Sequence, residues 1–395
     1  MNRKYAILVG DGMADYEIPE LDNKTPLEYA STPNMDYLAS QGHVGLVSTV
    51  PEGFIPGSDV ANLSLLGYDP TQYYSGRAPI EAASLGIKLG PEDTAFRCNL
   101  VTIIDGIMVD YSAGHIGTNE ACKLINDLQQ ALGNDQVQFH PGSSYRHILV
   151  VKNFPQGLKC TPPHDITDQN IDAFMPTGTG EKCIQEIMSK SRKILEQVRP
   201  NLTRNTNDEK TATDIWLWGH GKSLTIPKLE DRFGLKGSVI SAVDLVRGLG
   251  LLAGLHVRMI DGATGYLGTN YSGKVQAAQE ALENEDFVYL HVEAPDETSH
   301  EGSLQKKIQA IEEFDKCVVG EMVAYQKQNS NLRILIAPDH ATPISLKTHS
   351  SVPVPFVVSG PGISAGNCSI YCEKVAQGKT IFTGPQLFKH FIKGF

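Results

Sequence analysis

Seven residues of the types that bind divalent cations are spread along this chain of 395 residues, and most of them follow short apolar runs. Together they offer three carboxylates, three imidazoles and one hydroxyl, which are enough donors for two cations. Oxygen and nitrogen donors without a thiolate favour Mn²⁺, with Mg²⁺, Zn²⁺ or Co²⁺ as alternatives. Each residue alone could be a turn, helix-start or surface residue, but their recurrence predicts a metal site. They are Asp11, Ser58, Asp296, His300, Asp339, His340 and His349.

Ser58 is the candidate nucleophile in this set. It lies in the segment PEGFIPGSDVANLSLLGYDP, where Pro56 and Gly57 break any preceding regular structure. The apolar residues that follow predict a short helix closed by Gly67, with Ser58 near its N-cap. The simpler alternative is that Ser58 only caps this helix. Coordination to a cation would favour its alkoxide, so the pattern predicts phosphoryl or sulfuryl transfer to Ser58.

Three predicted strands would bring the other ligands together. The run YAILVG, residues 5–10, precedes Asp11, and DFVYLHVEAPDETSH carries Asp296 and His300 just beyond its apolar part. NLRILIAPDHATP does the same for Asp339 and His340. Continuous apolar runs of this length are typical of strands buried on both faces of a parallel sheet. Because ligands collect at the carboxyl edge of such sheets, we expect these side chains to meet there.

The remaining pattern predicts an α/β protein with two domains. We expect helices over 236–255 and 303–328 and a strand over 352–360. The alternation of strands and helices near both termini indicates one sheet built from both ends of the chain. Residues 1–77 and 233–395 would form a discontinuous metal-binding catalytic domain with a central, mostly parallel sheet. Residues 78–232 contain their own strand and helix patterns and would form an inserted α/β cap domain that binds substrate.

Composition excludes several kinds of partner. The formal net charge of −11 argues against nucleic acid or an anionic membrane as the main partner. No apolar run is long enough for a membrane span, and the N-terminal run is too short for a signal peptide. The seven cysteines are scattered without a CxxC pair, which indicates reduced thiols. We therefore expect a cytoplasmic protein with a small anionic substrate; the sequence indicates no oligomeric state.

Five segments carry a resemblance to a known family. VGDGMAD, GSDVANLSLLGYDP, HVEAPDETSHEG, APDHATP and KTHSSVPVPFV occur in this order along nearly the whole chain. Together they resemble the archaeal-type 2,3-bisphosphoglycerate-independent phosphoglycerate mutases of the alkaline phosphatase superfamily. The resemblance implies an alkaline-phosphatase-like metal domain with a cap. It also implies interconversion of 3-phosphoglycerate and 2-phosphoglycerate in glycolysis and gluconeogenesis, with two metal ions and without 2,3-bisphosphoglycerate.

The resemblance also implies roles for single residues. Asp11, Ser58, Asp339 and His340 would hold one cation, and Asp296, His300 and His349 the other. Ser58 would be transiently phosphorylated. The motifs RAPIEAASLGIKL, AFRCNLVT and DYSAGHIG nominate substrate-binding residues in the cap, and a strand-flanking Arg and Lys are weaker candidates that could equally be surface charges. These six are His115, Arg97, Arg77, Asp110, Arg146 and Lys222.

Other functions remain open from the sequence. A homoserine kinase-like phosphotransferase could use the same scaffold with a donor such as ATP. A metal-dependent phosphatase or a phosphopentomutase would keep the metal site and change the cap. The segment WGHGKS is not a P-loop, because Trp216 occupies the position of the first required glycine. A binding protein with a structural metal is disfavoured, since structural sites are closed and need no serine at a helix start.

Overall fold

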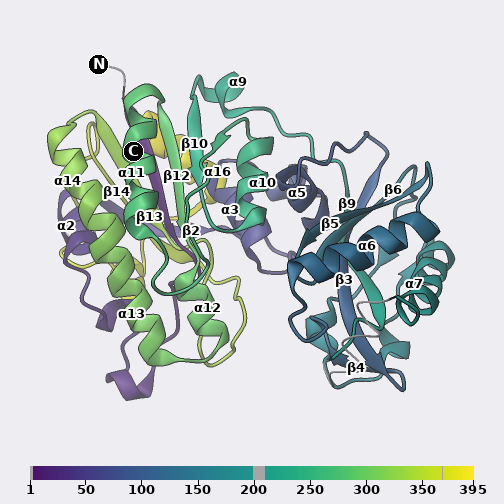
Figure 1. The fold of residues 1–395 in the computed structure, drawn as a ribbon. Helices are drawn as coiled ribbons and strands as arrows, with labels where there is room; N and C mark the ends of the chain where they lie inside the picture. The colour runs from purple at the N-terminus through teal and green to yellow at the C-terminus, as the bar shows by residue number, and fades with distance from the viewer. Residues whose placement is uncertain (1–2, 199–209, 367) are drawn as a thin grey trace. The chain divides into compact units, whose positions relative to one another are not determined.

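The structure is a computed structural model that describes residues 3–198, 210–366 and 368–395. The chain forms two compact units (Figure 1). Unit 1 comprises Met1–Tyr74 and Thr225–Phe395, and unit 2 comprises Ser75–Leu224. The inserted substrate-binding domain expected over 78–232 stays a prediction.

Unit 1 is built on an eight-stranded sheet with the strand order β11-β10-β12-β1-β13-β14-β2-β15. At its centre, β1 pairs in parallel with both β12 and β13. Only β14 runs antiparallel to its two neighbours, β13 and β2. The predicted α/β fold with a central, mostly parallel sheet is therefore confirmed. The strands are β1 (Lys4–Gly10), β2 (His43–Ser48), β10 (Gly237–Ile240), β11 (His256–Val257), β12 (Phe287–Val292), β13 (Leu332–Ala337), β14 (Val354–Ser359) and β15 (Ile381–Thr383).

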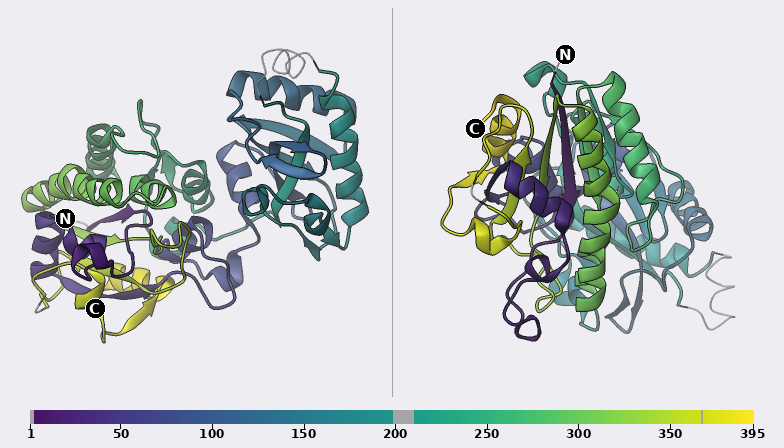
Figure 2. Two further views of the ribbon diagram at one scale, coloured as in Figure 1. Left: turned by 90° about the horizontal axis from the view of Figure 1, so that it is seen from below. Right: turned by 90° about the vertical axis from the view of Figure 1, so that its left-hand side faces the viewer.

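Helices cover both faces of this sheet, as the right-hand view of Figure 2 shows. Alternate residues of β1 point to opposite faces, so Ala6 and Leu8 join one core while Tyr5 contacts Phe391 on the other side. The first face carries α2 (Pro33–Gln41), α11 (Tyr271–Asn284), α13 (Leu304–Phe314) and α14 (Gly320–Gln328). The second carries α3 (Ser58–Leu65), α10 (Asp244–Leu252) and α16 (Gly384–Lys393). Shorter helices are α1 (Pro26–Tyr29), α4 (Pro70–Tyr73), α9 (Leu229–Phe233), α12 (Ala294–His300) and α15 (Glu373–Ala376).

Unit 2 has an antiparallel sheet of its own. The long strand β3 (Thr94–Ile104) pairs with β4 (Ile107–Asp110), β6 (Arg146–Val151) and β9 (Asp214–Lys222), and β5 (Val137–Ser143) pairs with β6. The amphipathic helices α6 (Thr118–Leu132) and α7 (Glu181–Leu195) cover one face. Helix α5 (Arg77–Ser84) covers the other, where Ala78 and Ala82 pack on Ala95 and Ile148. A small ribbon of β7 (Leu158–Lys159) and β8 (Thr177–Gly178) completes the unit.

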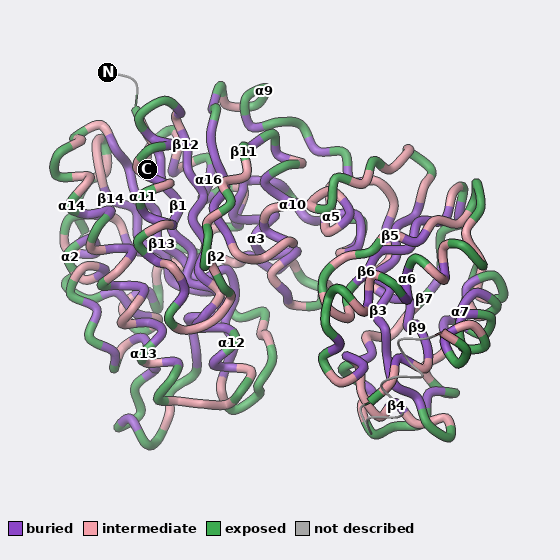
Figure 3. The backbone as a smooth tube through the Cα atoms, in the orientation of Figure 1, coloured by how far each residue is buried: buried purple, intermediate pink, exposed green. Residues whose placement is uncertain are grey.

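Two sequence-based elements need comment. The expected helix over 236–255 is wrong for residues 237–240, which form β10; the run GSVI is fully buried and pairs with β11 and β12, so sheet pairing outweighs the helical pattern. The expected helix over 303–328 is confirmed, with one π-helical turn at Asp315–Val319. The central strands β1, β12, β13 and β3 are buried along most of their length, whereas edge strands such as β5 and β15 are more exposed (Figure 3). Within the described residues, no helix is long and apolar enough to cross a membrane.

Candidate metal site and nucleophile

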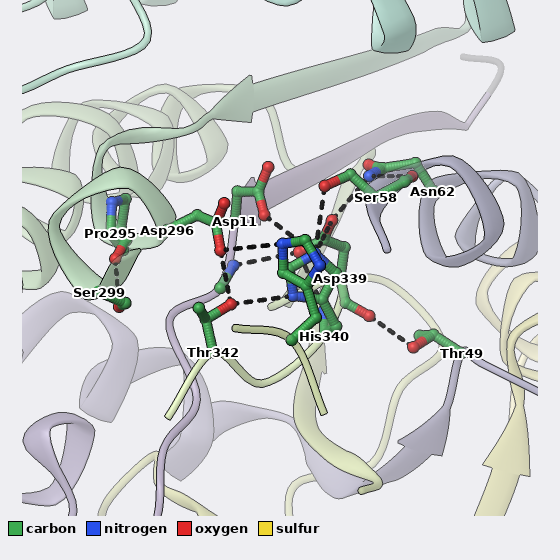
Figure 4. Close-up of polar contacts among 12 residues, drawn as sticks. Asp11, Thr49, Ser58, Asn62, Pro295, Asp296, Ser299, Asp339, His340 and Thr342 are labelled. Carbon is green, nitrogen blue, oxygen red and sulfur yellow. Dashed lines mark hydrogen bonds and ion pairs between the residues drawn. The ribbon is translucent and has the colours of Figure 1, made fainter. Parts of the chain in front are cut away.

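The carboxyl edge of the unit 1 sheet gathers the predicted ligands. The strands β12, β1 and β13 are adjacent and parallel, so the segments that follow them start from the same edge. Asp11 follows β1 directly, Asp296 lies in the first turn of α12 after β12, and Asp339 and His340 follow β13. Figure 4 shows these side chains converging with Ser58 at the start of α3. The predicted meeting of ligands at one sheet edge is therefore what the fold produces.

Ser58 does not cap its helix. Helix α3 begins at Ser58 itself and Gly57 is the N-cap residue; the side chain that accepts from an N–H group of the first turn is Asp59, whose Oδ1 lies 2.9 Å from the N of Val60. A residue that is already within the first turn has helical geometry, so its hydroxyl cannot reach the free N–H groups as an N-cap hydroxyl does. The Ser58 Oγ instead lies 3.1 Å from Nε2 of His340. Ser58 thus lies next to the N-cap, as expected, and its hydroxyl is directed at the ligand cluster.

One group of ligands surrounds His340. Its Nε2 lies 3.5 Å from Oδ1 of Asp11 and 3.4 Å from Oδ2 of Asp339. Asp339 is held in place by the backbone N–H groups of Gly12 and His340, which donate to its Oδ1 at 3.1 and 2.9 Å. All of these side chains except Ser58 are buried. The loops after two parallel strands thus fix one another through the ligands themselves.

A second group contains Asp296, His300 and His349. His300 Nε2 lies 3.1 Å from Oδ2 of Asp296, four residues before it on α12, and 3.1 Å from Nε2 of His349. His349 Nε2 lies 3.7 Å from Oδ1 of Asp296. The Nδ1 of His300 lies 2.9 Å from the carbonyl oxygen of Lys347, so its N–H can donate there and leave Nε2 as the free ligand atom. The potential ligand atoms of this trio all lie within 4.8 Å of one another.

The electrostatics of the cluster call for positive charge. Burial raises the pKa of Asp11 well above its usual value, and the carboxylates of Asp339 and Asp296 raise it further. The Oδ1 of Asp11 is buried and has no hydrogen-bond partner among the described residues. Burial would also raise the pKa of Asp296, but hydrogen bonds to His300 and His349 hold it well below its usual value. Three buried carboxylates with an orphaned oxygen fit divalent cations, which would neutralise them.

The histidines respond to the same field in different ways. Burial alone would lower the pKa of His300, but its hydrogen bond and charge interaction with Asp296 raise the pKa to about 9. Burial dominates at His340 and lowers its pKa, so this imidazole is neutral and has a lone pair to offer. His300 must lose its proton before it can bind a cation, because a protonated imidazole has no free lone pair.

Three contributors to the site were missed by the sequence reasoning. His291, in β12, lies with its Nε2 2.9 Å from Oδ2 of Asp11, and burial lowers its pKa to about 4. Asn62, one turn into α3, donates to Oδ2 of Asp339 at 2.8 Å. Thr342 contacts both Asp296 and His340. A polar residue inside an apolar strand is an available signal, and it applies to His291; Asn62 lies in a helix that contains other polar residues, so nothing local distinguishes it.

Unit 2 brings together three of the expected substrate-binding residues. Arg77 and Arg97 donate through their Nε atoms to the two oxygens of Glu81, at 2.9 and 2.8 Å. Burial would raise the pKa of Glu81, but Arg97, Arg77 and Arg146 outweigh it and lower the pKa. The guanidinium of Arg97 also stacks over Trp218 at 4.2 Å. Glu81 is in the quoted motif RAPIEAAS, but the sequence reasoning gave it no role.

The other candidates in unit 2 are placed differently. His115 is exposed, and its ring centroid lies 6.2 Å from that of Tyr145, over which Arg146 also stacks. Asp110 accepts hydrogen bonds from Ser112 and Lys210; burial would raise its pKa, but these bonds lower it to about 2. Lys222 forms an ion pair with Glu92. Asp110 and Lys222 thus have protein partners of their own.

This fold and site define an α/β protein with candidate metal-binding side chains gathered at the carboxyl edge of a parallel sheet. Comparison with known proteins narrows the class. A family model described as 2,3-bisphosphoglycerate-independent phosphoglycerate mutase matches residues 39–201. The chain is 52% identical over 380 residues to a probable enzyme of this name from Geobacter sulfurreducens, covering 95% of both chains. It is 51% identical over 357 residues to the one from Methanosarcina mazei, covering 90% of both.

A solved structure of a protein from Pyrococcus horikoshii has the same fold, with a TM-score of 0.83 and 27% identity over 100% of this chain and 98% of that one. The protein therefore belongs to the family of 2,3-bisphosphoglycerate-independent phosphoglycerate mutases. This confirms the resemblance carried by the five sequence motifs and identifies the protein as a glycolytic isomerase of that type.

Proposed function

We propose that the protein moves a phosphoryl group between the 3- and 2-hydroxyls of glycerate through a phosphoserine at Ser58. Family membership gives the reaction class, a phosphoglycerate mutase that does not use 2,3-bisphosphoglycerate. The single observation that carries the phosphoserine is the position of Ser58 Oγ, 3.1 Å from His340 Nε2 and beside buried carboxylates. A serine hydroxyl held among cation ligands at a sheet edge can be activated as a nucleophile by metal coordination.

Two divalent cations fit the ligand groups described above, with Mn²⁺ the first candidate by donor type. Asp11, Ser58, Asp339 and His340 would hold one, and Asp296, His300 and His349 the other. Bound there, the cations would lower the pKa of the serine hydroxyl and offset the negative charge that accumulates at phosphorus. The orphaned Oδ1 of Asp11 supports this assignment, because a buried carboxylate oxygen without a partner is costly.

The proposed reaction consists of two phosphoryl transfers, one to Ser58 and one back to glycerate. Ser58 Oγ attacks the phosphorus of 3-phosphoglycerate, its bond to phosphorus forms, and the bond from phosphorus to the C3 oxygen breaks. The proton lost by Ser58 is matched by one gained at that C3 oxygen, which leaves glycerate beside phosphoserine. The 2-hydroxyl of glycerate next attacks the same phosphorus, gives up its proton and frees Ser58. Water must be kept away from the phosphoserine, since hydrolysis would make the protein a phosphatase.

We further propose that unit 2 binds the anionic groups of the substrate. Arg77, Arg97 and Arg146 act on a single carboxylate, Glu81, so the cluster carries more positive than negative charge. Guanidinium groups match carboxylates and phosphates in geometry, and both occur in phosphoglycerate. His115 is proposed as an acid/base group or a phosphate contact. Asp110 is a weaker candidate because its carboxylate would repel an anion, and Lys222 is weaker because its single ammonium already pairs with Glu92.

The test is a rapid-quench experiment on the chelator-treated protein refilled with Mn²⁺. With phosphoryl-labelled 3-phosphoglycerate we expect label in 2-phosphoglycerate and, transiently, in the peptide that contains Ser58. A parallel assay supplies homoserine with ATP. Phosphorylation of homoserine without mutase turnover would overturn the substrate, and turnover without any labelled peptide would overturn the intermediate.

A further inference from the structure

A buried threonine connects the two ligand groups. The hydroxyl of Thr342 donates to Oδ1 of Asp296 at 2.5 Å and lies 3.1 Å from Nδ1 of His340 (Figure 4). Asp296 belongs to the group with His300 and His349, whereas His340 belongs to the group with Asp11 and Asp339. The Thr342 side chain is fully buried, so water does not compete for its hydrogen bonds. Thr342 is therefore placed to act on both groups at once.

The donor and the acceptor of each hydrogen bond follow from the number of hydrogens on each group. A hydroxyl has one hydrogen, and an ionised carboxylate can only accept, so the Thr342 hydrogen points to Asp296. The Thr342 oxygen must then accept from His340, which puts the imidazole proton on Nδ1. The other ring nitrogen, Nε2, is left with its lone pair facing Ser58 Oγ. This is the tautomer that a cation ligand needs.

We propose that Thr342 is a positioning residue that fixes the tautomer of His340 and couples its orientation to Asp296. Metal-binding histidines usually donate their second ring N–H directly to a carboxylate or a carbonyl. Here the donation passes through a threonine hydroxyl to a carboxylate of the neighbouring group. The part of this inference that concerns cations rests on the proposed function, whereas the tautomer does not.

The surroundings hold Thr342 in this position. Its backbone N–H donates to the carbonyl oxygen of Ala14 at 3.1 Å, and its own carbonyl oxygen accepts from the ammonium of Lys307 at 2.9 Å. Lys307 is fully buried and also donates to Asp15 at 2.8 Å, so its ammonium group connects the loop after β1 with the loop after β13. These two backbone hydrogen bonds fix the position of the Thr342 backbone, from which its hydroxyl reaches both ligand groups.

Gly12 makes the space for this hydrogen bond. Its φ of +61° is in the left-handed region, and a Cβ there would lie 2.6 Å from Thr342 Oγ1 and 2.5 Å from Asp296 Oδ1. Both distances are shorter than real carbon atoms tolerate, and the two atoms concerned are those that form the bond. A side chain at position 12 would therefore displace the bond between Thr342 and Asp296. The backbone is thus shaped around this contact as well as around the ligands.

The test uses two variants of the full-length protein. Thr342→Val keeps the side-chain shape and removes the hydroxyl, and Thr342→Ser keeps the hydroxyl. In Mn²⁺ titrations of chelator-treated protein, we expect Thr342→Val to lower the Mn²⁺ affinity of the ligand group that contains His340 by about 10–100-fold. The affinity of Thr342→Ser should stay close to that of the unmodified protein. Unchanged Mn²⁺ binding in Thr342→Val would overturn the role in cation binding.

A second measurement needs no metal, and its main result comes from the unmodified protein. Long-range ¹H–¹⁵N NMR spectra of the metal-free protein distinguish the two neutral tautomers of a histidine, and a His340→Gln variant identifies the signals of His340. We expect the proton on Nδ1 in the unmodified protein and a loss of that preference in Thr342→Val. A proton on Nε2 in the unmodified protein would overturn the proposal. Neither measurement involves phosphoglycerate, so failure of the mutase assay would not be confused with failure here.

Discussion

The hydroxyl oxygen of Ser58 lies 3.1 Å from Nε2 of His340, although the two residues are 282 positions apart in the chain. Helix α3 delivers the serine from one side of the sheet edge, and the loop after β13 delivers the histidine from the centre. Ser58 is not the N-cap residue of α3, so helix capping does not explain the position of its hydroxyl. The pairing is therefore better explained by chemistry at the hydroxyl than by helix capping.

Replacing Ser58 with alanine should stop catalysis and leave the fold intact. The helix keeps Gly57 as its N-cap, and alanine favours a helix, so we expect little change in melting temperature. Loss of the nucleophile should lower the rate of mutase turnover by at least about a thousandfold. Steady-state assays and circular dichroism check both statements, with Ser40→Ala in α2 as the matched serine control. Substantial turnover by Ser58→Ala would rule out a phosphoserine at this position.

Replacing His300 with alanine should remove one bound cation and spare the other. Among the described residues, His300 pairs with Asp296 and His349. Asp339 and Ser58 lie in the other ligand group. The number of Mn²⁺ ions bound per chain, measured by equilibrium dialysis, should therefore fall from two to one. The exposed His164 of unit 2 offers the control, and His164→Ala should retain two. An unchanged stoichiometry in His300→Ala would separate this histidine from the metal site.

Cation binding at the same group should release a proton below about pH 9. In the metal-free protein, the pKa of His300 is raised to about 9 by Asp296, so His300 is protonated at neutral pH. A cation must displace that proton, and the apparent affinity should therefore rise with pH and level off above about pH 9. Calorimetric titrations in buffers of different ionisation enthalpy measure the protons released. An affinity that falls with rising pH over this range would contradict the assignment.

Replacing Arg97 with lysine tests the proposed anion site. The Arg97 guanidinium uses its Nε for Glu81 and its face for Trp218, and a lysine ammonium can reproduce neither contact together with anion binding. We expect KM for 3-phosphoglycerate to rise by about tenfold or more, with a smaller effect on kcat. Arg192→Lys is the control, because Arg192 pairs with Asp214 in the same unit. Equal effects of the two substitutions on KM would count against a substrate role for Arg97.

The parts of the site that follow strands could be predicted, because an apolar run ending in Asp or His is visible along the chain. Asp11 and Asp339 are of this kind. His291 and Thr342 could not be assigned, since their roles depend on β1 lying between β12 and β13, and strand order is not written in any one segment. Glu81 was missed for a similar reason: it lies on α5, whereas its partner Arg97 lies on β3.

The fold shows the same division. The strand β10 was taken for helix because its four residues adjoin α10, and only its neighbours β11 and β12 make it a strand. Ser58 lies near the N-cap as expected, but Ser and Gly are both acceptable N-caps, so the sequence alone did not assign the cap to Gly57 and the first helical position to Ser58. Local chemistry was thus readable, whereas features set by contacts between distant segments required the structure.

Unit 2 should lose stability as the pH falls below about 6.5, where a histidine of the unfolded chain gains a proton. His147 in β6 is buried, its Nδ1 accepts from the N–H of Gly142 at 2.9 Å, and its Nε2 has no partner among the described residues. Burial lowers the pKa of His147 to about 3, so the folded form stays neutral where the unfolded form is protonated. The stability is therefore complete above about pH 6.5 and declines towards about pH 3.

At about pH 5 this one residue should cost about 2 kcal/mol of unfolding free energy relative to neutral pH. Both tryptophans of the chain, Trp216 and Trp218, lie in β9, so their fluorescence reports denaturant unfolding of unit 2. His147→Asn can still accept from Gly142 but cannot titrate, and its loss of stability between pH 7 and pH 5 should be smaller by that amount. The exposed His164→Asn should behave like the unmodified protein, and equal pH dependence in all three would place the acid sensitivity elsewhere.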